Sequence, residues 1–358
     1  MFLYFLLYGN IIISHPNNYW RYVSANILVF TIIEGSRYLR GIDYHHYGLY
    51  FSHPEYKILE EDIGFETLNN VLRLFSHDIH FAFIMYAFIT IVSLCLFIKP
   101  FKELYGIVFI NMLIFIIHPS EWIIRQFISI SIVYASFGLF FIKKLKLFAL
   151  FALVGCTIHY SSLLLLLSFI ILNLFRKPIP IKISVPAIVL IMSVFSIDAF
   201  VDVLFSELEK TNLSIFQDYS YFVYVTRSDE FLTSNSAGTI TGNRSLITTL
   251  LNLLFYLSVF YEGYRLLKKS EDKKIIVIYN MFVIGSLLYE LFLKYELYSR
   301  LFRPLELVGF IVTAFIISQR QKCNYKWTWL YVILFLFMNA VSFIYFPKDN
   351  YYKFIWDK

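Results

Sequence analysis

A polar segment over residues 37–47 could bind a phosphate or a sugar. It follows an apolar block directly and holds the candidate ligand-binding residues Arg37, Arg40, Asp43, Tyr44 and Tyr47. Arginine binds phosphate oxygens through paired hydrogen bonds, and Gly41 would let the backbone turn close to a ligand. In the alternative interpretation, the two arginines extend toward the membrane surface and pair with Asp43.

Acidic residues are concentrated in the next polar stretch, at Glu60, Glu61, Asp62 and Glu66. One of them could accept a hydrogen bond or a proton from a sugar hydroxyl. Acidic side chains also suit the positive end of a helix, so helix capping is the alternative explanation. From Phe65 to Leu74 the apolar residues recur at helical spacing, which predicts an amphipathic helix at the membrane interface.

Arg125 and Gln126 open an apolar block. On a helix beginning near Trp122, Arg125 would lie about one turn inside the membrane, where a charge costs several kcal/mol and suggests function. An i,i+4 ion pair with Glu121 is the alternative. His159 interrupts another apolar stretch at its midpoint. It could act as a base or donate to phosphate, or it could be structural.

Three further arginines belong to the late part of the chain, Arg244, Arg300 and Arg303. Arg300 and Arg303 would share one face of a helix. Together with Arg37, Arg40 and Arg125 they are candidates for binding a diphosphate on one side of the membrane.

The elements that must hold these residues are membrane helices. Of 358 residues, 59% are hydrophobic and 16% charged, whereas soluble domains average about 45–50% and about 25%. The mean hydropathy is +0.65. The apolar blocks are continuous rather than alternating, so the fold class is an all-α, polytopic integral membrane protein, and soluble enzymes and transmembrane β-barrels are excluded.

We expect about twelve transmembrane or re-entrant helices in a single membrane domain over residues 1–358. The predicted blocks are 2–14, 22–36, 79–98, 104–118, 125–142, 147–158, 160–175, 183–198, 246–266, 275–293, 304–318 and 327–346. Polar outer connections are expected at about 37–78 and 199–245. The stretch 147–175 is either two thin spans or a re-entrant hairpin.

The positions of the basic residues predict the orientation. Alternate connections are rich in Lys and Arg, around Arg21, 99–104, 143–146, 176–182, 265–274 and 320–326. Such loops mark the cytoplasmic side, so both termini are expected outside and the polar candidates lie on the outer face.

Several classes of chemistry are missing from the sequence. It has no Gly-rich phosphate loop, no nucleophile elbow and no Cys/His metal spacing. Cys95, Cys156 and Cys323 predict no disulfide and no zinc site. The net charge of +6 belongs mainly to the basic connections, so we expect no nucleic-acid partner. We also expect no cofactor and no metal.

In order and spacing, four pieces resemble the EpsG-like branch of the Wzy-type bacterial polysaccharide polymerases across about residues 30–175. They are Arg40-Gly41-Ile42-Asp43-Tyr44 with Tyr47, Glu61-Asp62-Ile63-Gly64-Phe65, Arg125-Gln126 and His159-Tyr160-Ser161. Where the family usually has an acid and a proline before the Gly-aromatic pair, this chain has Asp-Ile. The acidic counterpart is therefore either Glu61 or Asp62.

The resemblance implies a glycosyltransferase of the bacterial cytoplasmic membrane, working on its outer side. It would move a growing glycan from undecaprenyl diphosphate to the next lipid-linked oligosaccharide. Arg125, His159, Glu61 and Asp43 are then the candidate catalytic residues. The substrate-binding candidates are Arg37, Arg40, Tyr44, Tyr47, Gln126, Arg244, Arg300 and Arg303. Membrane lipids, a chain-length regulator and other polysaccharide assembly proteins are the candidate partners.

Two rival functions are a lipid-linked oligosaccharide flippase and a membrane acyltransferase that modifies surface sugars. A flippase needs cationic residues in a cavity reachable from both sides, and the acyltransferase needs a polar site facing the cytoplasm. Here the polar candidates cluster on one predicted face, which favours the polymerase.

Overall fold

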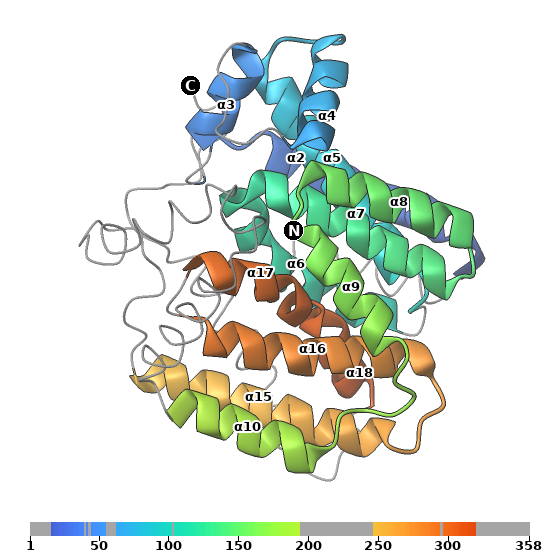
Figure 1. Cartoon of the computed structure of the whole chain (residues 1–358). Coiled ribbons are helices and arrows are strands. Elements are labelled where there is room, and N and C mark those ends of the chain that lie inside the picture. Colours follow the sequence, from blue (N-terminus) through green and yellow to red (C-terminus); the bar gives the residue numbers. More distant parts are fainter. Residues whose placement is uncertain are drawn as a thin grey trace.

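The computed structural model is a bundle of helices (Figure 1). It describes residues 16–38, 41, 44–54, 62–101, 104–193, 246–293 and 296–319. Every regular element in these ranges is a helix, as the composition predicted.

One part of the bundle is built from the first half of the chain. A short 3-10 turn, η1 (Pro16–Asn18), leads into its helices. These are α2 (Tyr19–Gly35), α5 (Ile79–Ile98), α6 (Tyr105–Trp122), α7 (Ile124–Phe141) and α8 (Leu145–Ile158). Helix α5 packs between α2 and α7, and α8 covers the other side of α7. The short helices α3 (Tyr44–Ser52) and α4 (Ile63–Arg73) cap this part (Figure 1).

The other part contains the late helices α10 (Ile181–Ser193), α15 (Leu246–Leu267), α16 (Lys273–Leu291), α17 (Glu296–Leu307) and α18 (Gly309–Ser318). Helix α9 (Ser162–Leu172) joins the two parts, because it contacts α7 on one side and both α16 and α17 on the other. Helix α6 packs against α18. A continuous apolar core therefore runs through both parts.

Within the described residues, four helical stretches are long and apolar enough to cross a membrane. They are Ile79–Ile98, Ile124–Phe141, Lys273–Leu291 and Tyr298–Ser318, and they correspond to four predicted blocks. Other predicted blocks form helices too, several of them shorter than a full span. The blocks 2–14 and 327–346 and the outer connection 199–245 lie outside the described residues.

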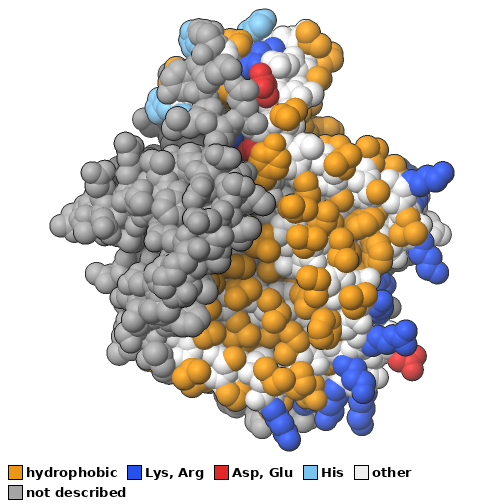
Figure 2. Space-filling view, viewed as in Figure 1, with side chains coloured by type: hydrophobic (Ala, Val, Ile, Leu, Met, Phe, Trp, Pro, Cys, Tyr) orange, Lys and Arg blue, Asp and Glu red, His pale blue; other side chains and the backbone are white. Residues whose placement is uncertain are grey.

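Basic connections gather at one end of the bundle. The Lys274 ammonium donates to the Pro100 carbonyl at 3.2 Å, and the Asn280 amide donates to the Lys177 carbonyl at 3.1 Å. Figure 2 shows Lys and Arg side chains along this edge, beside a mainly hydrophobic band. Exposed residues here include Lys143, Lys144, Lys146, Arg176, Lys268, Lys269 and Lys273. The grouping agrees with a shared cytoplasmic side; the predicted connection at 320–326 lies outside the described residues.

The stretch 147–175 forms a short helical hairpin. Helix α8 has 14 residues and α9 has 11, which gives lengths of about 21 Å and about 16 Å. Both are shorter than the roughly 30 Å of a bilayer core, and both helices start or end beside the basic edge. Their lengths favour the re-entrant alternative, with His159 at the apex.

The predicted amphipathic helix forms as α4. Protein covers one part of its apolar surface, while Leu74 and Phe75, just after the helix, are exposed. Phe65 and Leu72 are buried in a cluster shared with α3, α5, α7 and α8. Arg73, at the end of α4, donates to the carbonyls of Tyr50 and Phe51 at 2.6 and 2.9 Å. These carbonyls belong to the last turn of α3, so Arg73 caps that helix and fixes α3 against α4.

Gly64 allows the start of α4 to touch the end of α8. A Cβ at this position would lie 2.5 Å from the Thr157 carbonyl carbon and 2.6 Å from the Ile158 backbone nitrogen. Real Cβ atoms do not come that close to backbone. Glycine is therefore required where α4 meets the residues directly before His159.

A methyl group at Gly64 should separate α4 from α8. We expect Gly64→Ala to lower the free energy of unfolding by about 1–3 kcal/mol through overpacking, measured by thermal unfolding of the purified protein in detergent. Gly48→Ala is the matched control, because a Cβ there would meet Ile79 at an ordinary 3.7 Å. Equal melting temperatures for the two variants would contradict the close approach.

Candidate functional site

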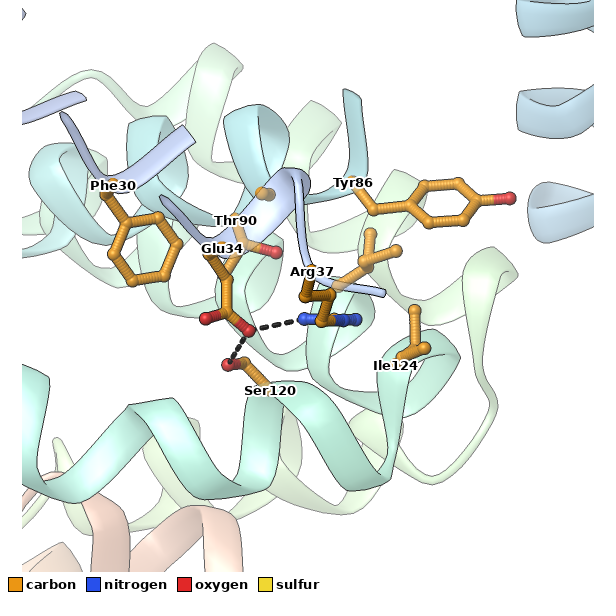
Figure 3. A pocket seen from close by; sticks show the side chains of 9 residues that line it. Phe30, Glu34, Arg37, Tyr86, Thr90, Ser120 and Ile124 are labelled. Carbon is orange, nitrogen blue, oxygen red and sulfur yellow. Dashed lines mark hydrogen bonds and ion pairs between the residues drawn. The ribbon is translucent and has the colours of Figure 1, made fainter. Parts of the chain in front are cut away.

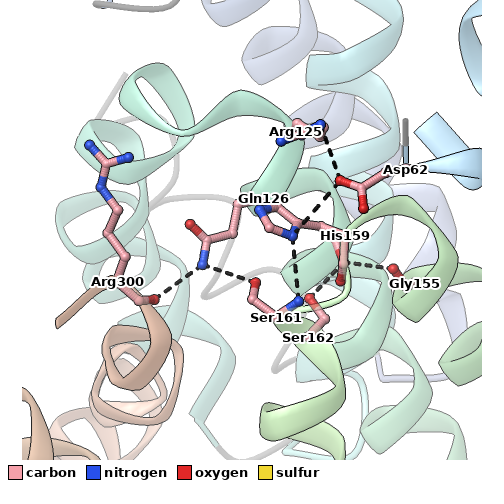
Figure 4. A network of polar contacts seen from close by, with 9 residues as sticks. Asp62, Arg125, Gln126, Gly155, His159, Ser161, Ser162 and Arg300 are labelled. Atoms are coloured by element: carbon pink, nitrogen blue, oxygen red, sulfur yellow. Dashed lines mark hydrogen bonds and ion pairs between the residues drawn. The ribbon is translucent and has the colours of Figure 1, made fainter. Parts of the chain in front are cut away.

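Asp62, Arg125 and His159 meet where α4, α7 and α8 converge (Figure 4). The Arg125 guanidinium lies 3.2 Å from the Asp62 carboxylate, and His159 Nδ1 lies 3.9 Å from the same oxygen. The Asp62 side chain is only 5% exposed, whereas Arg125 is 18% and His159 25% exposed. The carboxylate is thus enclosed, while the cation and the imidazole remain partly accessible.

Asp62 precedes α4 but does not cap it through its side chain. Its backbone carbonyl accepts from Phe65 and Glu66, which starts the helix, and its carboxylate turns to Arg125 instead. Of the two acids that the sequence left open, Asp62 is the one the structure describes. Glu61 lies outside the described residues.

Arg125 is the second residue of α7, and the predicted helix from Trp122 does not run through it. Helix α6 ends at Trp122 and α7 begins at Ile124. Glu121 and Arg125 therefore lie on different helices, and the i,i+4 geometry of a continuous helix does not apply. The partner of Arg125 in the site comes from α4, far earlier in the chain.

Gln126 compensates for a proline in α17. Pro304 lies inside that helix and has no backbone N–H, so the Arg300 carbonyl, four residues earlier, loses its usual partner. The Gln126 side-chain amide donates to this carbonyl at 3.1 Å and to the Ser161 hydroxyl at 3.2 Å. Gln126 thus ties α17 and the hairpin apex to the first turn of α7, and its amide group is engaged within the protein.

Serine hydroxyls fix the apex of the hairpin. Ser129, one turn after Arg125, donates to the Gly155 carbonyl at 2.6 Å and lies 2.6 Å from the Ser162 hydroxyl. The same Gly155 carbonyl, in the last turn of α8, also accepts from the His159 backbone N–H at 3.3 Å. The end of α8 and the start of α9 are therefore held against α7, with His159 between them.

Burial, followed by the positive charges of Arg125 and Arg300, lowers the pKa of His159 to about 3. The ring is neutral at ordinary pH, so its contact with Asp62 is not an ion pair. The Ser161 backbone N–H lies 3.4 Å from Nδ1. If it donates there, the proton of the neutral ring is on Nε2, which can donate to a ligand.

The structure brings some of the predicted site residues together and separates others. Arg125, Gln126, His159 and Arg300 share one network (Figure 4). Arg303 stacks over the Tyr289 ring, and Arg37 pairs with Glu34 on another side of α7. Tyr44 and Tyr47 are buried in the aromatic core of the α3–α4 cap. Arg40, Asp43, Glu61 and Arg244 lie outside the described residues.

Sequence reasoning missed Ser129, Pro304 and Glu34. Two local signals were available, since Ser129 follows Arg125 at i+4 and Glu34 precedes Arg37 at i−3. The link between Gln126 and Pro304 joins distant segments and has no local signal.

The residues of this site lie within a match to a protein-family model. The EpsG family model matches residues 20–356. The chain belongs to the EpsG family. Membership suggests a polysaccharide polymerase of Wzy type, and the match extends the resemblance beyond residues 30–175 to nearly the whole chain. No curated protein and no solved structure gives a significant match.

In this EpsG-family protein, the cost of losing Gln126 should depend on Pro304. We expect Gln126→Ala to destabilise the fold by about 1–3 kcal/mol, because it leaves the Arg300 carbonyl unsatisfied inside the protein. Pro304→Ala restores a backbone N–H, so the same change should cost clearly less in that background. Unfolding free energies of the four proteins in the cycle give the coupling.

Pro186→Ala removes the proline inside α10 and is the matched control. It should leave the cost of Gln126→Ala unchanged. If Gln126→Ala costs the same in the wild type and in the Pro304→Ala background, then Gln126 does not compensate for the proline.

His159 should make the EpsG-family fold less stable in acid. The unfolded ring takes up a proton near about pH 6.5, whereas the folded ring does so only near about pH 3. Between these values the unfolded state binds more protons, so this contribution to stability falls as the pH falls. We expect the melting temperature to drop less from pH 7 to pH 5 in His159→Gln than in the wild type.

His45→Gln, at an exposed position of α3, is the control and should keep the wild-type pH dependence. The burial argument fails if His159→Gln and the wild type lose the same number of degrees.

Proposed function

We propose that this chain polymerises a surface polysaccharide by transferring a growing glycan from undecaprenyl diphosphate to the next lipid-linked repeat unit. The observation that carries the proposal is the meeting of Arg125, Asp62 and His159 at the end of the bundle opposite the basic connections, within an EpsG-family chain. On this proposal the reaction takes place on the outer side of the bacterial cytoplasmic membrane.

The charges of the site suit a diphosphate. Arg125 and Arg300 both act electrostatically on His159. With one carboxylate and a neutral imidazole, the group carries a net positive charge. Arginines placed in advance around a leaving diphosphate stabilise its developing charge, which typically contributes several kcal/mol.

We propose the following transfer step. A hydroxyl oxygen of the acceptor sugar bonds to the anomeric carbon of the donor glycan, and the bond from that carbon to the diphosphate oxygen breaks. The electron pair leaves with undecaprenyl diphosphate, which Arg125 and Arg300 hold. The hydroxyl proton passes to the Asp62 carboxylate, and the His159 ring serves as a hydrogen-bonding group.

Arg125→Ala should abolish polymer formation. In the native host lacking this gene, complementation with the wild type restores long surface polysaccharide, and the variant at equal protein level should leave single repeat units. Loss of one preorganised charge-stabilising group costs about 10²–10³ in rate. The readout is the electrophoretic profile of surface polysaccharide.

Arg176→Ala, at the basic edge, is the matched control and should give normal polymer. Normal polymer with Arg125→Ala would remove Arg125 from the reaction. In the uncomplemented host, loss of all surface repeat units with lipid-linked units trapped inside would indicate a flippase instead. Full-length polymer lacking one substituent would indicate an acyltransferase.

Membrane lipids, a chain-length regulator and other assembly proteins are the partners that this proposal implies.

A further inference from the structure

A second polar pocket lies on another side of α7 (Figure 3). Glu34, in the last turn of α2, and Arg37, two residues after the helix ends, form an ion pair and are 5% and 4% exposed. The Ser120 hydroxyl of α6 lies 3.5 Å from the Glu34 carboxylate. The other lining residues are Phe30, Tyr86, Ala87, Thr90, Ile124 and Ile128. A buried ion pair in a membrane protein is costly and suggests function.

The pocket offers both a donor and an acceptor. Arg37 Nε is buried and has no hydrogen-bond partner within the described part of the chain, while the Glu34 carboxylate can accept. The pair carries no net charge, so it favours neither an anion nor a cation. A neutral group that donates and accepts at once fits this chemistry, and a hydroxyl does so. The space holds about one group of that size.

The first turn of α7 separates this pocket from the site around Arg125. Ile124 and Ile128 line the pocket, whereas Arg125 turns to Asp62. One side of the turn is thus positively charged and the other is neutral and polar. A glycosyl transfer needs these two environments side by side, one for a diphosphate and one for a sugar hydroxyl.

We infer that Glu34 and Arg37 bind one hydroxyl of the acceptor sugar and so orient the acceptor toward the donor. This inference rests on the proposed function, and it assigns the recognition of the acceptor to the end of α2 and the residues that directly follow it. The hydroxyl donates to the Glu34 carboxylate and accepts from Arg37 Nε. Glu34 is a binding residue here, since the reacting proton leaves through Asp62.

The test distinguishes a defect in acceptor binding from a defect in the reaction of the donor. The full-length protein in lipid nanodiscs is given lipid-linked repeat units extracted from host cells lacking this gene. Two rates are measured: polymer formation, which needs donor and acceptor, and release of glycan to water, which needs the donor alone. Glu34→Gln should slow polymer formation at least about tenfold and leave release to water within about twofold of the wild type. Arg125→Ala should lose both.

Ser120→Ala removes only the hydroxyl beside Glu34 and should give a smaller loss of the same kind, which keeps the test valid if Glu34→Gln does not fold. Thr31→Val is the control. Thr31 is a buried α2 residue whose hydroxyl has no partner among the described residues, and its replacement should change neither rate.

Three results would overturn the inference. Equal loss of both rates in Glu34→Gln would mean that the ion pair merely supports the Arg125 site. Unchanged polymer formation would mean that the pocket holds only water. If the wild type itself forms no polymer from these repeat units, the proposed function fails, and the acceptor pocket fails with it.

Discussion

The ion pair between Asp62 and Arg125 is the interaction on which the site depends. A guanidinium in the first turn of a membrane helix needs a partner, and the partner comes from α4, which is not part of the spanning bundle. The Asp62 carboxylate reaches Arg125 because Gly64 allows the start of α4 to pack directly against the backbone at the end of α8. The aromatic core of the cap and the Arg73 cap on α3 then hold α4 in that place. The cap therefore belongs to the site as much as the spanning helices do.

Pro304 and Gln126 show the same constraint in the late half of the chain, where a buried polar group is satisfied by a residue from a distant segment. The proline frees a carbonyl in α17, and a side chain from α7 satisfies it. An exposed carbonyl can accept a hydrogen bond from water. A carbonyl inside the protein needs a donor from the protein itself, and this fixes the position of that donor. The hydrogen bond from Gln126 holds the backbone of Arg300 in place, and the charge of the Arg300 side chain acts on His159. The early and late halves of the chain therefore meet near His159, whose pKa is lowered by Arg125 from one half and by Arg300 from the other.

The all-helical class of the fold could be predicted from the sequence, because hydropathy is a local property. Local signals also marked Arg125 and His159 as candidates, and the structure places both beside Asp62. The turn at His159 was predicted from the basic flanks and is present. The partner of Arg125 was not predicted, because pairing with Glu121 assumed one continuous helix and the chain breaks before Ile124. Tyr44 and Tyr47 resembled ligand-binding residues by composition alone, yet Tyr44 stacks on Phe83 at 4.4 Å in a core that forms only when α3 meets α5.

On the proposed function, the separation of charges around α7 would let one helix serve two substrates. Arg125 faces a carboxylate that neutralises it when no anion is bound, so the site need not hold an unpaired cation while it waits for substrate. A diphosphate would compete for the guanidinium and leave the Asp62 carboxylate less constrained, at the moment when a proton must be accepted. On the other side of the turn, Glu34 and Arg37 form an ion pair with each other, which suits a neutral hydroxyl. On this proposal, donor binding is linked to the availability of the base, and acceptor recognition is independent of it.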